Sequence, residues 1–212
     1  MIDGQASLSA FVLAGGHSRR FGSDKAMVEI SGTPQILRLQ RRLLQLDLDP
    51  VWVCDRIERL QQFSVKTIVD VQSASGPMSG LAAALRYTLS NRGGWLLLLS
   101  CDQVLLREDW IAALVAGTRE PVQYRAIVFR SAQSNAAMPA LPPLNPVPGL
   151  YHTTLLPQVV QRLEAREFSL QKLLRNTQTL ELETFEDPRR WSFNTPEELQ
   201  NICERLQLSV GQ

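Results

Sequence analysis

The stretch Ala10–Ala26, AFVLAGGHSRRFGSDKA, indicates most clearly how this chain folds. Its apolar run Ala10–Leu13 leads into a Gly-Gly pair, which is typical of a short buried strand that ends in a tight turn. Two arginines, another glycine and an Asp-Lys pair follow. If the strand belongs to a parallel sheet, this loop lies at the sheet edge where ligands bind.

Further apolar runs indicate that the strand has parallel neighbours. They predict strands at Val51–Cys54, at Thr67–Val69 and at Trp95–Asp102, where the sequence WLLLLSCD ends in an acid. Helical spacing of apolar residues predicts helices over Ile36–Leu46 and Leu81–Leu89. Strands that are apolar on both faces and alternate with helices imply a parallel sheet covered on both sides. The first half is therefore predicted to be doubly wound.

The second half of the chain is less regular. Its predicted elements are a helix at Asp109–Ala116, a strand at Ala126–Phe129, helices at Leu155–Glu164 and Leu170–Arg175, a strand at Thr179–Glu183 and a last helix opened by NTPEEL. The segment Met138–Tyr151, MPALPPLNPVPGLY, is rich in proline, which disfavours both a central strand and a helix interior. We therefore expect it to be a loop that crosses the active face.

The composition excludes several classes of protein. With 44% hydrophobic and 20% charged residues, the 212-residue chain is expected to fold. Its 22 Lys and Arg against 21 Asp and Glu give no broad basic field, so a nucleic-acid partner is not expected. The three cysteines are too few for a disulfide framework or a zinc site, which favours a reducing cytoplasm. Neither a signal peptide nor a membrane span is predicted.

The loop after the first strand has the chemistry of a triphosphate site. Gly15 and Gly16 would allow backbone N–H groups to approach a phosphate, and Arg20 and Lys25 would neutralise its charge. Neither GxGxxG nor GxxxxGK[ST] can be written through these residues, so the two best-known phosphate loops are excluded. A tight turn with solvated arginines is the other interpretation of the same residues.

Residues at two later strand ends are further candidates. Asp102 is a candidate Mg²⁺ ligand, because Mg²⁺ takes one or two carboxylates together with phosphate oxygens; a helix cap is the alternative role. Asp70 closes an earlier strand in the same way, and turn chemistry is its alternative role. Gly76 and Gly80 stand where a strand gives way to a helix, so backbone there could approach a nucleobase or a ribose.

Taken in order, these features resemble the molybdenum cofactor guanylyltransferase family of the nucleotidyltransferases. The resemblance rests on LAGGHSRRFGSDKA (13–26), GPMSGL (76–81), SCD (100–102) and FNTPEEL (193–199). It implies a Rossmann-like three-layer α/β sandwich with a mixed, mainly parallel sheet. The chain would be a single domain over 1–212, with a nucleotide-binding half at about 8–106 and an acceptor-binding half at about 107–208.

The resemblance also implies a reaction and a set of site residues. GMP would pass from GTP to the phosphate of the molybdenum-pterin cofactor, with release of pyrophosphate and with Mg²⁺ as cofactor. The nucleotide site would contain Leu13, Ala14, Gly15, Gly16, Lys25, Asp70, Gly76, Gly80 and Asp102. The catalytic residues would be Arg20, Lys25 and Asp102, of which Asp102 holds the metal. The acceptor side would contain Asn145, Ser192 and Asn194. A molybdoenzyme or a cofactor-delivery protein is a further candidate partner.

Some residues bear on the choice of substrate. The sequence LAGG favours GTP, because related cytidylyltransferases more often resemble LAAG at this place. Three residues depart from the family pattern: Cys54 stands where an Asn is common, Asn145 precedes Pro146 in place of His or Gln, and Ser192 opens what is often an Asn-x-Asn-Thr-Pro motif. They leave open an enzyme that uses CTP or another phosphate acceptor, and a non-catalytic protein that only binds nucleotide or cofactor.

Overall fold

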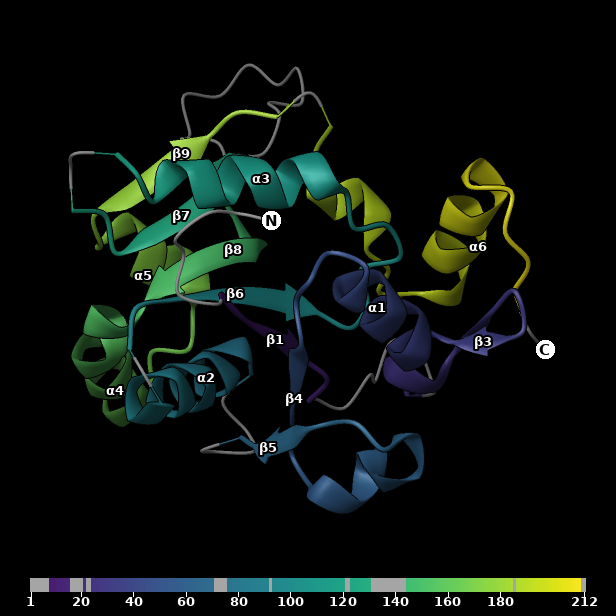
Figure 1. Ribbon diagram of the computed structural model, residues 1–212, viewed down its shortest axis with the longest axis horizontal. Coiled ribbons are helices and arrows are strands. Elements are labelled where there is room, and N and C mark those ends of the chain that lie inside the picture. The colour runs from purple at the N-terminus through teal and green to yellow at the C-terminus, as the bar shows by residue number, and fades with distance from the viewer. Residues whose placement is uncertain are drawn as a thin grey trace.

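The chain folds around one mixed sheet. The computed structural model describes residues 8–15, 21, 24–70, 76–91, 93–120, 123–130, 144–184 and 186–210. Its seven-stranded sheet has the order β5-β4-β1-β6-β8-β7-β9, with β8 antiparallel to both neighbours and every other pair parallel (Figure 1). The predicted α/β fold with a mixed, mainly parallel sheet is confirmed. Gly16 and Arg20 lie outside the described residues.

The elements have the following bounds. The strands of the large sheet are β1 Ser9–Leu13, β4 Pro50–Cys54, β5 Thr67–Val69, β6 Trp95–Ser100, β7 Ala126–Arg130, β8 Leu144–His152 and β9 Thr179–Leu182. A small hairpin consists of β2 Glu29–Ile30 and β3 Thr33–Pro34. The helices are α1 Gln35–Leu44, α2 Pro77–Asn91, α3 Glu108–Gly117, α4 Leu156–Glu164, α5 Leu170–Arg175 and α6 Pro196–Arg205. Short 3-10 helices occur at η1 Lys25–Met27, η2 Ile57–Phe63, η3 Thr153–Leu155 and η4 Pro188–Trp191.

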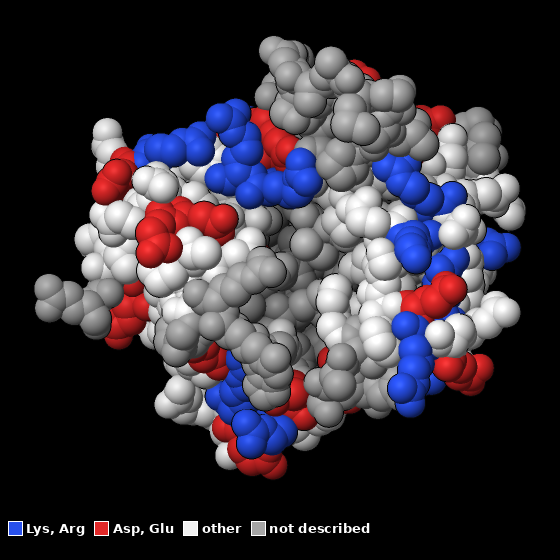
Figure 2. Space-filling model, turned by 180° about the vertical axis from the view of Figure 1, so that it is seen from behind, with Lys and Arg blue, Asp and Glu red and all other residues white. Residues whose placement is uncertain are grey.

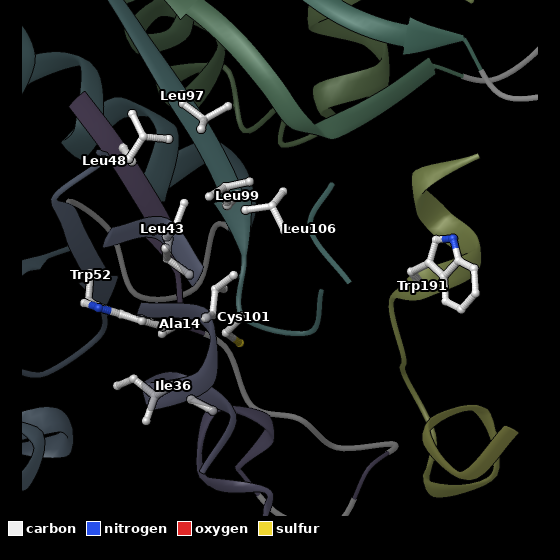
Figure 3. Packing of buried hydrophobic residues seen from close by; sticks show 14 of the residues in the cluster. Ala14, Ile36, Leu43, Leu48, Trp52, Leu97, Leu99, Cys101, Leu106 and Trp191 are labelled. Atoms are coloured by element: carbon white, nitrogen blue, oxygen red, sulfur yellow. The ribbon is translucent and has the colours of Figure 1, made fainter. Parts of the chain in front are cut away.

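Strand β1 is central because both of its faces are covered. Ala10 and Val12 pack in one apolar cluster with α1, α3 and α6, whereas Phe11 packs in a second cluster with α2, α4 and α5. Side chains alternate between the two faces of a strand, so burial of both faces requires the continuous apolar run seen in the sequence. Figure 3 shows part of the first cluster, with Leu43 of α1 and Leu97 of β6 among its side chains.

Strand β8 corrects the expectation of a loop over Met138–Tyr151. Leu144–His152 is a strand that lies between β6 and β7, and residues 138–143 lie outside the described residues. Its pairing with β7 is broken between Gly149 and Asn145, so that Pro146 and Pro148 fall in a bulge where they have no register partner. A bulge needs no ladder hydrogen bond from these residues, which is why the prolines are compatible with an internal strand.

Gly149 is required by the way this bulge folds back. A Cβ at this position would lie 2.7 Å from the carbonyl oxygen of Pro146 and 3.0 Å from Cγ1 of Val128. We therefore expect Gly149→Ala to lower the free energy of unfolding by about 1–3 kcal/mol, as measured by urea denaturation. Gly117→Ala is the comparison, because its Cβ would meet side-chain atoms only, Cδ2 of Leu180 at 2.9 Å and Cγ2 of Ile127 at 3.1 Å, and alanine gains helix propensity. Equal losses in the two variants would contradict this explanation.

Local signals set the C-terminal helix. Thr195 caps α6 by accepting a hydrogen bond from the N–H of Glu198, whose own side chain returns to the cap backbone. Pro196 follows in the first turn, where its missing N–H costs nothing. Thr195 is therefore the cap residue, and Asn194 lies just outside the helix.

Among the described residues, no helix is both long enough and apolar enough to cross a membrane.

Candidate active site

Four parallel strands end at one edge of the sheet, and backbone hydrogen bonds continue beyond their last residues. The N–H of Cys101 donates to the carbonyl of Leu13 at 3.0 Å, and the N–H of Asp70 donates to the carbonyl of Cys54 at 2.8 Å. Ala14 and Cys101 consequently lie close together past the ends of β1 and β6 (Figure 3). The residues that follow these strands are thereby held in a row, as expected of a ligand site in a parallel sheet.

A cleft of about 420 Å³ opens along this edge. Most of the predicted site residues that the structure describes line it: Leu13, Ala14, Gly15, Lys25, Asp70, Gly76, Gly80, Asp102 and Asn194. A larger groove of about 770 Å³ lies between Met27–Glu29 and α6, but the described residues that line it include no Lys or Arg. The smaller cleft is therefore the one suited to a triphosphate.

Lys25 is held at the centre of the charged half of the cleft. Its Nζ donates to Oδ2 of Asp102 at 3.2 Å, to the carbonyl of Phe193 at 2.7 Å and to Oδ1 of Asn194 at 3.0 Å. The ammonium also lies 5.5 Å from the centre of the Phe193 ring. An ammonium has three N–H donors, so these contacts satisfy all of them. Only 13% of the Lys25 side chain is exposed, and the charge therefore acts in a partly desolvated site.

Asp102 has the chemistry of a Mg²⁺ ligand. One carboxylate oxygen, Oδ2, contacts Lys25, and among the described residues the other has no hydrogen-bond partner. The side chain is 19% exposed at the cleft wall. Within the described residues no three His, Cys, Asp or Glu side chains form a ready metal cluster. That arrangement fits Mg²⁺, which takes few protein carboxylates and completes its shell with phosphate oxygens and water.

Gly15 leaves the cleft open opposite Asp70. A Cβ at Gly15 would lie 3.8 Å from Oδ2 of Asp70 and 3.8 Å from the backbone N of Asp55, so a longer side chain would enter this space. Asp70 also accepts a hydrogen bond from the hydroxyl of Ser79 in α2. The backbone of Gly15 and the carboxylate of Asp70 are therefore neighbours in the cleft wall.

Gly80 has a packing role as well as its place in the cleft wall. A Cβ there would lie 2.5 Å from Cδ2 of Leu13, so the absence of a side chain lets α2 approach the end of β1. Leu13 also lines the cleft. Gly76 immediately precedes α2 and has φ of +61°, a conformation that favours glycine.

Cys54 does not take the place of the expected Asn in the cleft. The residue is fully buried, its Sγ donates to the carbonyl of Arg56 at 2.9 Å, and burial raises the pKa of the thiol. The next residue, Asp55, lines the cleft instead. The polar side chain that lines the cleft at the end of β4 is therefore Asp55, one position after the place where the family commonly has an Asn.

Sequence reasoning missed an ion-pair cluster in the cleft wall. The Nε of Arg59 contacts Oδ2 of Asp24 at 2.5 Å, and its Nη1 contacts Oδ1 of Asp55 at 3.1 Å. The hydrogen bond to Asp24 holds the pKa of Arg59 above its ordinary value. Burial raises the pKa of Asp55, but the hydrogen bond and charge of Arg59 outweigh it, so the net shift is downward. Both Arg59 and Asp55 are therefore ionised at neutral pH.

Two predicted acceptor residues lie away from the cleft. Asn145 is fully buried in β8 and donates from Nδ2 to Asp187 at 2.9 Å. Ser192 donates its hydroxyl to the carbonyl of Arg189 at 3.1 Å and pairs with Gln103 in an isolated bridge. Both support the segment that leads to Asn194, and only Asn194 lines the cleft.

The described residues on the face shown in Figure 2 form no broad basic field. On the face shown in Figure 2, Lys and Arg side chains are interspersed with Asp and Glu. The balance over the whole chain is a net charge of +1. Positive charge that would hold an anionic ligand is thus concentrated in local groups such as Lys25.

Comparison with known proteins identifies the class to which this fold and cleft belong. Residues 10–182 match the family model described as the MobA-like NTP transferase domain, so the chain belongs to this family of nucleotidyltransferases. A molybdenum cofactor guanylyltransferase from Pseudomonas putida is 32% identical over 209 residues, which cover 95% of this chain and all of the relative. The chain is accordingly a member of the molybdenum cofactor guanylyltransferase family, and the predicted membership is confirmed.

Solved structures agree on the fold. Molybdopterin-guanine dinucleotide biosynthesis protein A from Archaeoglobus fulgidus superposes with a TM-score of 0.77 at 17% identity, over 94% of this chain and 99% of that one. A CMP:2-keto-3-deoxy-manno-octonic acid synthetase complexed with CTP superposes with a TM-score of 0.73 at 16% identity, over 95% of this chain and 99% of that one. Since a CTP complex shares it, the fold alone does not select the base.

Proposed function

We propose that this chain transfers GMP from GTP to the phosphate of the molybdenum-pterin cofactor and releases pyrophosphate. The observation that carries the proposal is the Lys25–Asp102 pair at 3.2 Å, inside a cleft at the ends of parallel strands, in a chain of the molybdenum cofactor guanylyltransferase family. Lys25 lies beside a carboxylate whose other oxygen has no hydrogen-bond partner in the described part of the chain, and this pair suits a nucleoside triphosphate bound with Mg²⁺.

The chemistry needs little from the protein beyond charge and position. An oxygen of the acceptor phosphate attacks the α-phosphorus of GTP, the bond to the bridging oxygen of the β-phosphate breaks, and pyrophosphate leaves. The acceptor phosphate is already anionic near neutral pH, so no general base is required. A protein nucleophile is not required either. This agrees with Cys101, whose burial raises the pKa of the thiol and keeps it neutral.

In this proposal each residue of the cleft has its own role. Backbone groups at Gly15 face the nucleotide, and Lys25 stabilises negative charge on the phosphates as pyrophosphate departs. Asp102 would hold Mg²⁺, and that ion would screen the phosphate charges. In this proposal Gly16 and Arg20 also bind the phosphates, and Asp70 belongs to the nucleotide site.

The acceptor side of the proposal is supported by one residue of the cleft. Asn194 is exposed, lines the cleft and accepts from Lys25, so it lies between the phosphate site and solvent. We infer that the phosphate of the pterin cofactor enters from this side. Ser192 and Asn145 would support it from behind through the segment that contains Asp187. A molybdoenzyme or a delivery protein would then exchange cofactor on the same side.

The test is pyrophosphate release by purified protein with Mg²⁺ and molybdenum-pterin cofactor, with GTP, CTP and ATP supplied in turn. We expect pyrophosphate release when GTP is the nucleotide supplied, and none with CTP or ATP. Release only with CTP would overturn the guanylyl assignment. GTP binding without any release, when a control guanylyltransferase proves that the acceptor is competent, would overturn catalysis and indicate a binding protein. Omitting the cofactor should abolish release, because the α-phosphorus then has no acceptor.

A further inference from the structure

Arg59 connects two separate parts of the cleft wall. It belongs to η2, which follows β4, and its guanidinium contacts Asp24 at 2.5 Å and Asp55 at 3.1 Å. Asp55 follows the end of β4 in the sheet, whereas Asp24 lies at the end of the loop that follows β1. One planar side chain therefore joins Asp24 to the sheet edge at Asp55, a geometry that suits the fork of an arginine.

These contacts are more than a surface ion pair. The exposed fractions of the side chains are 16% for Arg59, 24% for Asp24 and 20% for Asp55, so all three are largely removed from water. Without Arg59, Asp24 would lose its ion pair, and Asp55 in the cleft wall would keep only the exposed Arg56 as a neighbouring cation. The loss of one partner from such a cluster costs more than the loss of an exposed pair.

Asp24 transmits this anchoring to Lys25. Its second oxygen, Oδ1, accepts a hydrogen bond from the N–H of Ala26 at 3.1 Å and so caps η1, the single turn that begins at Lys25. Arg59 and the N–H of Ala26 together fix both oxygens of Asp24. The orientation of the turn, and with it the point from which the Lys25 side chain extends, therefore depends on Arg59.

We propose that Arg59 is a positioning residue that acts through Asp24 to hold Lys25 against the phosphates. This inference rests on the role given to Lys25 in the proposed function. An ångström of displacement at a reacting group can cost as much as a hundredfold in rate. For Arg59→Met we therefore expect kcat to fall by about tenfold to a hundredfold, with KM for GTP changed by about threefold or less.

The decisive experiment combines this variant with one at Lys25. We would measure kcat and KM for the wild type, Arg59→Met, Lys25→Met and the double variant, at a temperature well below every melting temperature. If Arg59 acts only through Lys25, kcat of the double variant equals that of Lys25→Met alone. Effects that multiply would overturn the inference, and so would a rise in KM at unchanged kcat, which would mean that Arg59 binds GTP directly.

Two further variants keep the test independent of folding. Asp24→Asn retains an acceptor for the N–H of Ala26 but removes the charge that Arg59 holds, and we expect the same fall in kcat. Arg56→Met is the control, because the Arg56 side chain is 75% exposed and comes no closer than 3.6 Å to the carboxylate of Asp55. The kinetics of this variant should match those of the wild type. Wild-type kinetics in Asp24→Asn would also overturn the inference.

The same measurements separate failure of this inference from failure of the proposed function. No GMP transfer by the wild type would refute the proposed function. Unchanged kcat in Lys25→Met would refute the role of Lys25 and this inference with it, while GMP transfer itself would stand. If Lys25→Met lowers kcat, and kcat of the double variant falls by the product of the two single losses, the proposed function stands and only the positioning role of Arg59 is refuted.

Discussion

Lys25→Met is expected to lower kcat for GMP transfer by about a hundredfold to a thousandfold, while the Kd for GTP rises by about tenfold or less. Methionine keeps most of the length of the side chain and removes its charge. The ammonium matters most when negative charge develops on the departing pyrophosphate, so its loss should affect the transition state more than the bound substrate. Steady-state kinetics and calorimetric titration with GTP give the two quantities.

Lys172→Met provides the matched control for this prediction. Lys172 lies in the last turn of α5 and is exposed, and it does not line the cleft. Its kcat and its Kd for GTP should both equal those of the wild type. If Lys25→Met weakened GTP binding and slowed turnover by the same factor, Lys25 would be a binding residue only, contrary to the proposed role.

Asp102→Asn is expected to lower the Mg²⁺-dependent rate by about a hundredfold to a thousandfold. The amide keeps the shape of the side chain but loses the negative charge that a hard divalent cation prefers. Lys25 would keep its contacts with the Phe193 carbonyl and with Asn194, so the fold of the cleft should survive. Titration of activity with Mg²⁺ should show a weaker dependence, as should titration of GTP binding with Mg²⁺.

The control for Asp102 is Asp109→Asn. Asp109 lies in the first turn of α3, where its exposed side chain pairs with Arg107, and it is not part of the cleft. Its activity should respond to Mg²⁺ as the wild type does. An unchanged metal response in Asp102→Asn, both in activity and in GTP binding, would remove Asp102 from its proposed role as the metal ligand.

The sequence was most informative where local rules determine local structure. The apolar run before Gly15 predicts β1 because a strand buried on both faces has no polar alternation, and NTPEEL predicts the start of α6 because cap, proline and acids act within one turn. The resemblance to the guanylyltransferase family then placed Lys25 and Asp102 in one site. Both lie in the same cleft, 3.2 Å apart.

The features that the sequence did not predict depend on residues that are far apart in the chain. Strand β8 contains Pro146 and Pro148, and a rule that excludes proline from internal strands fails when a bulge removes the need for their N–H groups. The contact between Arg59 and Asp24 joins residues 35 positions apart, and nothing in their own neighbourhoods marks either as the partner of the other. Such pairs become visible only once the ends of β1 and β4 are known to be adjacent.

The contact between Lys25 and the Phe193 carbonyl also bears on how the molecule is assembled. The two residues are 168 positions apart in the chain. During synthesis β1, β4, β5 and β6 can emerge and pair long before the residues around Phe193 leave the ribosome, whereas Lys25 lacks two of its three acceptors until that moment. Contacts of such long sequence separation close late in folding. The contacts that hold Lys25 should therefore be among the last of the site to form, and a nascent chain should acquire full transfer activity only after the residues around Phe193 have emerged.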